Sequence, residues 1–395
     1  MCRKSELTRV MMKNQPPAIG PTERKARVTA LCGLMQEAGL SAVLIGPTSS
    51  LRYFTGMSWH PSERFTGALI HASGTIDYIT PAFERDKVAG IIGLPGDIHT
   101  WEEDESPYRL IANRLPRGKL AIDDQVALFT FLGLRRAIPE ERLADAGPMI
   151  TRLRRQKSPA ELALMTYAKA VTLEVHRRAW KSLTPGIRTS EVEHFINEEH
   201  RKFSGGPSTF CIVSFAQDTA LPHGGETDRA LKHGDLVLID TGCKIDGYCS
   251  DITRTYTFGE ATPKMRDVWR HEKDAQAAAF AAARLGEPCE SVDAAARAVL
   301  QRHGYGPDYR LPGLPHRTGH GIGLDVHEAP NLVRGDETPL ARGMCFSNEP
   351  MIVIPNEFGV RLEDHFYMTE NGARWFTEPQ ASIEDPFANV QAFAA

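Results

Sequence analysis

The chain has 395 residues, of which 42% are hydrophobic, and its 46 basic and 50 acidic side chains give a net charge of −4. The length suggests about two domains. The charge lacks the basic excess of nucleic-acid-binding proteins, and no apolar run reaches the roughly 18 residues of a membrane span. We therefore expect no nucleic-acid partner and no membrane segment.

The first part of the chain alternates helix and strand signals. Residues 1–20 lack the apolar core of a signal peptide and are expected to form a flexible tail. A helix is predicted over residues 21–39, followed by strands at 41–46, 67–71, 75–80 and 119–124. Residues 21–155 are therefore expected to form a smaller α/β domain. The seven irregularly spaced cysteines indicate reduced thiols and a cytoplasmic protein.

The second part, residues 156–395, repeats one order of elements. The basic stretch 151–157 marks the boundary, and Ser158 with Glu161 forms a capping box that starts a long helix to about 182. Ser190 and Glu193 are expected to cap a shorter helix, and a hairpin follows. A long helix from Pro263, a short helix and a second hairpin then repeat this order, which suggests a duplicated half.

The first hairpin is predicted around Asp246-Gly247, the strongest short signal for a two-residue type I′ turn. With these two residues as the loop, Asp251 lies opposite Gly242. Asp240 is then its diagonal neighbour on the same face, about 7–8 Å away between Cα atoms. Side chains at this spacing are able to share metal ions.

The second hairpin, over residues 344–370, is expected to place Glu349 opposite Glu363 if its loop spans 355–357. The strands around both acids are strongly apolar. Buried carboxylates need compensation, because burial penalises their charge and like charges repel. Two hairpins that each bring two acids together therefore indicate bound cations rather than four separate surface acids.

A nitrogen ligand is expected from the segment HRTGHGIGLDVHEAP at 316–330, whose glycines permit close backbone approach. Two divalent metal ions are predicted on five side chains: Asp240, Asp251, His320, Glu349 and Glu363. A set dominated by oxygen favours Mn²⁺, with Co²⁺, Fe²⁺ and Zn²⁺ as alternatives. Three histidines on predicted helices are expected at the surface: His176, His194 and His200.

Together these segments resemble the pita-bread metallopeptidases of family M24, in the prolidase and Xaa-Pro aminopeptidase branch. The resemblance rests on LIDTG at 238–242, GYCSDITRTY at 247–256, the segment at 316–330, SNEP at 347–350 and GVRLEDHFYMTENG at 359–372. YFTGMSW at 53–59 resembles the creatinase-type N-terminal domain less specifically. The fold implied is α+β, with a pita-bread catalytic domain over 156–395 and a creatinase-type α/β domain over 21–155.

The resemblance also implies a role for each site residue. Asp240 and Asp251 would hold one metal ion, His320 and Glu349 the other, and Asp251 and Glu363 would bridge. Three residues are expected to be catalytic: Glu349, His223 and His327. His223 would stabilise the tetrahedral intermediate, and His327 would contact the substrate. Arg361 is either a substrate-binding cation for a dipeptide carboxylate or a structural ion pair with a ligand carboxylate.

The activity implied is that of an Xaa-Pro dipeptidase (prolidase), a cytoplasmic homodimer acting on a small peptide with proline at the second position. Xaa-Pro aminopeptidase is the first alternative. A non-peptidase enzyme of the same fold, such as an ectoine or creatine hydrolase or a lyase, and a non-catalytic binding module are further ones. One residue departs from the family pattern: Val353 stands where a tyrosine is common, which removes a hydrogen-bonding group expected near the site.

Overall fold

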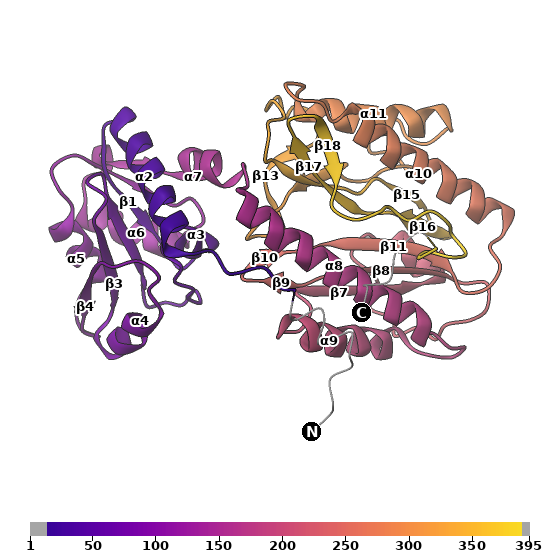
Figure 1. The fold of residues 1–395 in the computed structure, drawn as a ribbon, viewed down its shortest axis with the longest axis horizontal. Helices are drawn as coiled ribbons and strands as arrows, with labels where there is room; N and C mark the ends of the chain where they lie inside the picture. Colours follow the sequence, from indigo (N-terminus) through magenta and orange to yellow (C-terminus); the bar gives the residue numbers. More distant parts are fainter. Residues whose placement is uncertain (1–13, 389–395) are drawn as a thin grey trace. The chain divides into compact units, whose positions relative to one another are not determined.

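The computed structural model describes residues 14–388, which form two compact units that divide between Arg154 and Arg155. The N-terminal unit comprises Ala18–Arg154, and the C-terminal unit continues from Arg155 (Figure 1). Most of the tail predicted at 1–20 lies outside the described residues. Within the part of the chain that is described, no helix is long and apolar enough to cross a membrane.

The N-terminal unit is built on a six-stranded mixed sheet in the order β4-β3-β2-β1-β5-β6. The strands are β1 (Leu40–Ile45), β2 (Gly67–His71), β3 (Ile76–Pro81), β4 (Asp97–Trp101), β5 (Lys119–Ile122) and β6 (Leu143–Asp145). The helices are α2 (Pro21–Glu37), α3 (Ser49–Thr55), α4 (Arg85–Ile91), α5 (Pro107–Arg114), α6 (Leu128–Ala137) and α7 (Gly147–Arg154), with short 3₁₀ turns η1 (Ala82–Glu84) and η2 (Glu140–Arg142). The apolar runs predicted as strands form β1, β2, β3 and β5, as expected for an α/β unit.

The C-terminal unit contains two pairs of helices, each a long one followed by a shorter one. They are α8 (Pro159–Ser182), α9 (Thr189–Ser204), α10 (Pro263–Ala282) and α11 (Cys289–Arg302). The predicted capping box of α8 is confirmed, since Ser158 accepts from the Glu161 amide and Glu161 accepts from the Ser158 amide. The predicted cap of α9 was wrong: Arg188 is the N-cap, and its amide donates to the Glu191 carboxylate.

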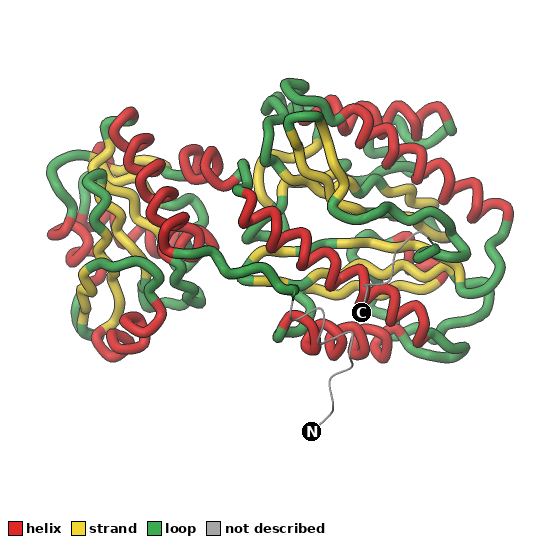
Figure 2. The backbone as a smooth tube through the Cα atoms, viewed as in Figure 1, coloured by secondary structure: helices red, strands yellow, loops and turns green. Residues whose placement is uncertain are grey.

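The strands of the C-terminal unit lie between the α10–α11 pair and α9 (Figure 2). One sheet has the order β11-β8-β7 and another the order β13-β12-β14-β17-β18; β9–β10 and β15–β16 form two-stranded ribbons. The first-hairpin region contains β7 (Phe210–Phe215), a 3₁₀ turn η3 (Ala216–Ala220), β8 (Leu236–Gly242), β9 (Lys244–Ile245), β10 (Tyr248–Cys249) and β11 (Ile252–Thr257). The second contains β12 (Gly319–Gly321), β13 (Glu328–Leu332), β14 (Cys345–Asn348), β15 (Met351–Ile354), β16 (Phe358–Arg361), β17 (Asp364–Thr369) and β18 (Gly372–Trp375).

Two of the three histidines predicted at the surface are buried. His194 is exposed, but only 1% of His176 and none of His200 is accessible. His176 lies on α8, which contacts the β8–β11 sheet, and its Nε2 lies 2.9 Å from the Ile252 carbonyl oxygen. His200 faces back from α9 and lies 3.2 Å from the Thr172 hydroxyl. The prediction was wrong for these two because it considered each helix without its packing partner.

Candidate metal centre

The first predicted hairpin has the expected register. Asp246 and Gly247 form the loop with positive φ values of 47° and 84°, and the pairing continues beyond it so that Asp240 faces Thr253. Asp251 is therefore two residues from the partner of Asp240, which is the diagonal position that was predicted. A Cβ on Gly242 would lie 1.9 Å from the Ser250 carbonyl oxygen, so the close approach of the strands requires glycine.

The second hairpin also has the predicted register, with residues 355–357 as its loop. Ile354 pairs with Phe358 at the loop, and Met351 pairs with Arg361 further along. The same register resumes in β14 and β17, where Asn348 pairs with Asp364. Glu349 and Glu363 lie between these two ladders and therefore face each other, as expected.

The two hairpins meet at the predicted ligands. Thr253 of β11 forms a bridge with Glu363, whose amide donates to the Thr253 carbonyl oxygen at 3.1 Å. The Thr253 hydroxyl donates to Glu363 Oε2 at 2.8 Å. Because one residue joins both hairpins, the carboxylates of Asp240, Asp251 and Glu363 converge although they come from distant parts of the chain.

His320 completes the cluster from β12. Its backbone amide donates to the Ser347 hydroxyl at 2.8 Å, and its Nδ1 lies 2.9 Å from the Gly321 carbonyl oxygen. This carbonyl keeps the proton on Nδ1, so Nε2 presents a lone pair to the site. Nε2 lies 3.1 Å from Glu349 Oε1 and 3.8 Å from Asp251 Oδ2.

The residues at this centre fit divalent cations. Three buried carboxylate oxygens have no hydrogen-bond partner among the described residues: Asp240 Oδ1, Asp251 Oδ1 and Glu363 Oε1. A buried acceptor without a partner is costly. One ligand atom from each of Asp251, His320 and Glu363 also lies within 4.8 Å of the others. Four carboxylates and one imidazole form a donor set that suits such ions.

The pKa shifts of the clustered carboxyl groups also indicate a site for divalent cations. Burial, reinforced by the neighbouring Glu363 and Asp240, raises the pKa of the Asp251 carboxyl well above its usual range. Burial and the charges of Glu349 and Asp240 likewise raise the pKa of Glu363. Burial alone would raise the pKa of Glu349 too, but in the absence of metal a hydrogen bond from a protonated His320, with the positive charges of His320, His316 and Arg361, outweighs burial and lowers the pKa to about 2. The cluster carries more negative charge than its protein neighbours compensate.

Arg361 is bound within the protein rather than directed at a ligand. Its Nη2 donates to Asp240 Oδ2 at 2.7 Å, its Nε to the Thr253 hydroxyl at 3.1 Å, and its Nη1 to the Pro222 carbonyl oxygen at 2.8 Å. Only 3% of the residue is exposed. Of the two roles that the sequence left open, this geometry favours the structural ion pair.

A cavity of about 910 Å³ opens over the centre, and all eight predicted site residues line it. His223 lies on the loop after η3, and His327 packs its ring against His320 with centroids 4.2 Å apart. Two ionisable side chains that line the cavity, His316 and Arg317, were not among the predicted site residues. His316 keeps Nδ1 2.7 Å from the Arg317 carbonyl oxygen, and its buried Nε2 has no partner within the described chain. The position of His316 four residues before His320 was the one feature of the sequence that could have indicated a place at the site.

Comparison with known proteins identifies the family. The model of metallopeptidase family M24 matches residues 163–370, and the model of the creatinase/prolidase N-terminal domain matches residues 27–156. The chain belongs to metallopeptidase family M24. Enzymes of this M24 family use divalent metal ions, which agrees with the carboxylate cluster.

Relatives of this M24 metallopeptidase match it over most of its length. The probable dipeptidase PepE of Mycobacterium tuberculosis is 34% identical over 88% of this chain and 92% of its own. The Xaa-Pro dipeptidase of Lactobacillus helveticus is 31% identical over 89% and 96%. The crystal structure of dipeptidase PepE from Mycobacterium ulcerans superposes with a TM-score of 0.84, at 33% identity over 93% and 98%. The expected pita-bread fold with a creatinase-type N-terminal domain is thereby confirmed.

Val353, where this M24 chain differs from the family pattern, lies away from the cavity. Val353 is 4% exposed in the apolar core of the C-terminal unit, and its backbone pairs with Gly313. It is not among the described residues that line the cavity. Valine at this position therefore packs in the apolar core, where the family commonly has a tyrosine. The five predicted ligands still line the cavity.

A second group of possible ligands, Asp77, Asp97 and His99, lies in the N-terminal unit. Unlike the carboxylates of the centre, Asp77 is satisfied by protein donors. His71 Nε2 lies 3.0 Å and His99 Nε2 3.2 Å from its two oxygens, and Arg114 Nε donates at 3.1 Å. A carboxylate that already has three partners gains little from a metal ion, so we assign no metal to this group.

Proposed function

We propose that this M24 metallopeptidase is an Xaa-Pro dipeptidase that works in the cytoplasm as a homodimer. The observation that carries the proposal is the convergence of three partnerless buried carboxylate oxygens with His320 on the floor of one cavity. Relatives named as dipeptidases, one of them as an Xaa-Pro dipeptidase, support the same activity. Mn²⁺ is the metal favoured by the oxygen-rich ligands.

The bond before proline needs a dedicated site because it is a tertiary amide. It has no N–H, so peptidases that bind that hydrogen cannot hold it. The cavity instead offers apolar side chains beside the acidic floor: Phe210, Ile212, Pro222, Pro315 and Val326. Such a wall suits the pyrrolidine ring, while the acidic floor suits the free ammonium group of the substrate.

Asp240 and Asp251 would hold one ion and His320 and Glu349 the other, and both ions would share Asp251 and Glu363. Divalent ions bound there supply Lewis acidity and lower the pKa of bound water towards neutrality. Glu349 would accept the proton of the attacking water and deliver it to the departing proline nitrogen. His223 and His327 would donate hydrogen bonds to the substrate carbonyl oxygen as negative charge develops there.

A dipeptidase also needs a cation for the carboxylate of proline, and Arg317 is the one we propose. Arg361 is ion-paired with Asp240. Arg317 lines the cavity, and its Nη1 donates to the neutral Asn331 amide oxygen at 2.9 Å. Its guanidinium charge is therefore not neutralised by this partner. Arginine binds carboxylates in a fork geometry that selects a chain terminus at a fixed distance.

The test compares Ala-Pro with Ala-Pro-Ala in the presence of Mn²⁺, with a chelator control. An Xaa-Pro dipeptidase cleaves the dipeptide at least about tenfold faster, which corresponds to roughly 1.4 kcal/mol. Arg317→Met should raise KM for the dipeptide and reduce this preference, whereas Arg342→Met, a matched change in a surface ion pair with Glu370, should not. Faster cleavage of the tripeptide would favour an Xaa-Pro aminopeptidase, and cleavage of neither would exclude both.

A further inference from the structure

Pro350 interrupts the hydrogen-bond ladder of the second hairpin beside two of the predicted ligands. The register on either side places Pro350 opposite Leu362. The adjacent facing pair is Glu349 and Glu363, whose backbone amides both donate to segments outside the hairpin, at 2.8 and 3.1 Å. In an antiparallel ladder the next pair must then exchange its hydrogen bonds across the hairpin. Proline has no N–H, so the Leu362 carbonyl oxygen lacks the donor that the opposite strand would provide.

Gln276 of α10 supplies a donor at this position. Its Nε2 lies 3.1 Å from the Leu362 carbonyl oxygen and 3.4 Å from the Asn348 carbonyl oxygen on the opposite strand. Asn348 returns a hydrogen bond, because its Nδ2 donates to the Gln276 carbonyl oxygen at 2.9 Å. One side chain therefore contacts the residue before Glu349 and the residue before Glu363.

The orientation of the Gln276 amide follows from its contact with Lys273. Lys273 Nζ lies 3.1 Å from Gln276 Oε1. An ammonium group only donates, so the amide oxygen faces Lys273 and the NH₂ group faces the two strands. Gln276 is 1% exposed. Removal of its amide would therefore withdraw a donor from a buried carbonyl group, where water does not readily replace it.

Arg254 holds the chain on the other side of Glu363. Its Nη1 donates to the Glu363 carbonyl oxygen at 3.0 Å and its Nη2 to Asp364 Oδ1 at 2.7 Å. Gln276 Nε2 lies 3.3 Å from the second carboxylate oxygen of Asp364. Two buried side chains, one from α10 and one from β11, thus hold the backbone from Leu362 to Asp364.

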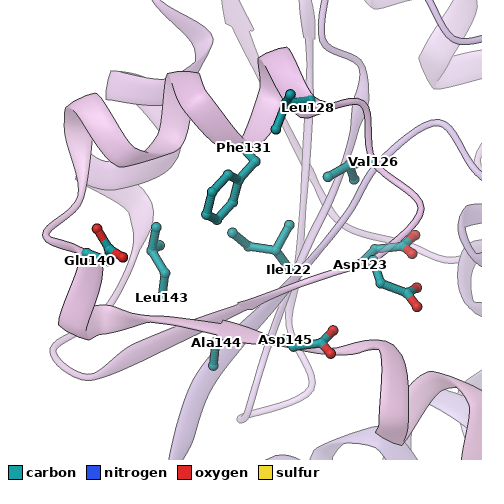
Figure 3. A pocket seen from close by; sticks show the side chains of 10 residues that line it. Ile122, Asp123, Val126, Leu128, Phe131, Glu140, Leu143, Ala144 and Asp145 are labelled. Atoms are coloured by element: carbon teal, nitrogen blue, oxygen red, sulfur yellow. The ribbon is translucent and has the colours of Figure 1, made fainter.

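The acidic side chains at a pocket of the N-terminal unit are positioned in a different way. Figure 3 shows the carboxylates of Asp123 and Asp145 at this pocket, whose volume is about 490 Å³. Each accepts a hydrogen bond from the backbone amide two residues further along the chain, at 3.1 and 2.7 Å. Such a local turn positions an acid without a distant element. Glu349 and Glu363 instead lie midway along a hairpin, so their placement depends on what holds its two strands together.

We propose that Gln276 is a positioning residue of the metal centre. By holding the carbonyl groups of Asn348 and Leu362, it fixes the separation of the Glu349 and Glu363 carboxylates for the metal ions. Among the described residues, Gln276 is not one of those that line the cavity, so it acts through these two ligands and not on the substrate. The inference rests on the proposed function, which assigns both glutamates as ligands and Glu349 as the group that moves a proton.

The test replaces Gln276 with methionine, which has a similar length and no hydrogen-bond donor. Isothermal titration of metal-free Gln276→Met should show Mn²⁺ binding at least about tenfold weaker than in the wild type, because Glu349 and Glu363 are no longer held at a fixed separation. With Mn²⁺ at saturation, kcat for Ala-Pro should fall at least about tenfold, because Glu349 is displaced from the reacting atoms. KM should stay within about twofold, because the substrate contacts are unchanged.

Gln380→Met is the matched control. Gln380 is 0% exposed, and its Nε2 donates to two backbone carbonyl oxygens, those of Thr255 and Ser382, each at 2.8 Å. Neither of these residues is adjacent in the chain to a proposed ligand. Both substitutions should lower stability in urea, but only Gln276→Met should weaken Mn²⁺ binding. Unchanged affinity in Gln276→Met, or equal weakening in both variants, overturns the proposal.

Gln276→Asn keeps the proposal testable if the methionine variant does not fold. It retains a buried amide, but its donor lies about 1.5 Å further from the strands because the side chain is one C–C bond shorter. It should also weaken Mn²⁺ binding, and wild-type affinity in this variant would overturn the proposal.

Failure of this inference is distinguishable from failure of the proposed function. A wild type that binds Mn²⁺ without cleaving Ala-Pro refutes the proposed activity alone. The comparison of affinities uses no substrate, so it still supports or overturns the role of Gln276. A wild type that does not bind Mn²⁺ overturns both proposals.

Discussion

At the scale of single residues, the metal centre is a place where protein neighbours leave negative charge uncompensated. Asp240 has Arg361 as a partner, but Asp251 Oδ1 and Glu363 Oε1 have no hydrogen-bond donor within the described residues. Such carboxylates cost stability in the absence of a cation and provide affinity in its presence. The same atoms should therefore decide both metal binding and the stability of the C-terminal unit.

We expect Asp251→Asn to abolish the response of the protein to metal. At 100 times the dissociation constant, Mn²⁺ should stabilise the wild-type C-terminal unit by about 2.7 kcal/mol, or roughly 5–10 °C in its unfolding temperature. The variant should show no such shift and should lose peptidase activity. Without metal it should be at least as stable as the wild type, because asparagine carries no charge at a position where burial and Glu363 disfavour the ionised carboxylate and raise its pKa. Calorimetry with Mn²⁺ and with chelator measures the two effects on stability, and an Ala-Pro assay measures the activity; a variant that Mn²⁺ still stabilises would contradict the assignment.

His176 should make the C-terminal unit sensitive to acid. Burial, with the charge of Arg254, lowers the pKa of His176 from 6.5 to about 3. Between these two values the unfolded chain binds a proton that the folded chain does not, so stability decreases as the pH falls below about 6.5. His176→Gln should reduce the slope of the unfolding free energy against pH by the contribution of one bound proton, about 1.4 kcal/mol per pH unit.

The slope for His176 is measured by urea unfolding at several pH values in that window. His194→Gln serves as the control, because His194 is exposed on α9 and should leave the slope at its wild-type value. An unchanged slope in His176→Gln would mean that His176 is protonated or exposed in the folded protein.

Some residue roles could be predicted from the sequence and others could not. The four carboxylates of the predicted ligand set followed from acids in apolar strands, because burial of a carboxylate demands compensation. The sequence left two roles open for Arg361, because spacing does not reveal whether a guanidinium turns towards a carboxylate or a cavity. The burial of His176 was missed for a related reason: a helix that packs on both a sheet and another helix has no single solvent face.

At the scale of elements, the close approach of β8 and β11 depends on Gly242. A Cβ at this position would lie 1.9 Å from the Ser250 carbonyl oxygen, so Gly242→Ala must push the strands apart between Asp240 and Asp251. We expect a loss of about 1–3 kcal/mol of stability and at least tenfold weaker Mn²⁺ binding, about 1.4 kcal/mol. Isothermal titration of the metal-free protein with Mn²⁺ measures the second effect.

Gly206→Ala provides the matched control for Gly242→Ala. Nothing in the described chain lies within 4 Å of a Cβ built on Gly206, so this variant should bind Mn²⁺ as the wild type does. Equal effects of the two substitutions would mean that loss of glycine flexibility, rather than the contact with Ser250, is responsible.

The register of the first hairpin could be predicted because turn chemistry fixes it, whereas that of the second depended on an assumed loop over residues 355–357, which the observed pairing bears out. Asp246-Gly247 accepts the positive φ values of a two-residue loop, and a one-residue change would turn every side chain to the other face. The start of α9 was misplaced because a serine that resembles a cap was preferred to Arg188. The Glu191 side chain accepts a hydrogen bond from the Arg188 amide. The residue that marks the start of α9 is therefore Glu191, the third residue of the helix, and not the N-cap residue.

At the scale of the whole molecule, the chain comprises two units with separate cores. The N-terminal core packs Leu44, Leu69, Ile79 and Leu120 of its sheet against α5 and α6, and it contains no partnerless carboxylate comparable with Asp251 in the described residues. The metal centre is contributed entirely by the C-terminal unit. Metal should therefore stabilise one unit and leave the other unaffected.

We expect calorimetry of the full chain to resolve two unfolding transitions, of which only one moves when Mn²⁺ is exchanged for a chelator. A unit with its own core unfolds cooperatively, and a ligand stabilises only the unit to which it binds. The transition that does not move should coincide with that of residues 18–154 produced alone. Asp251→Asn provides the control, because neither transition should then respond to metal. One transition that shifts as a whole would show that the two units unfold together and that the metal centre supports both.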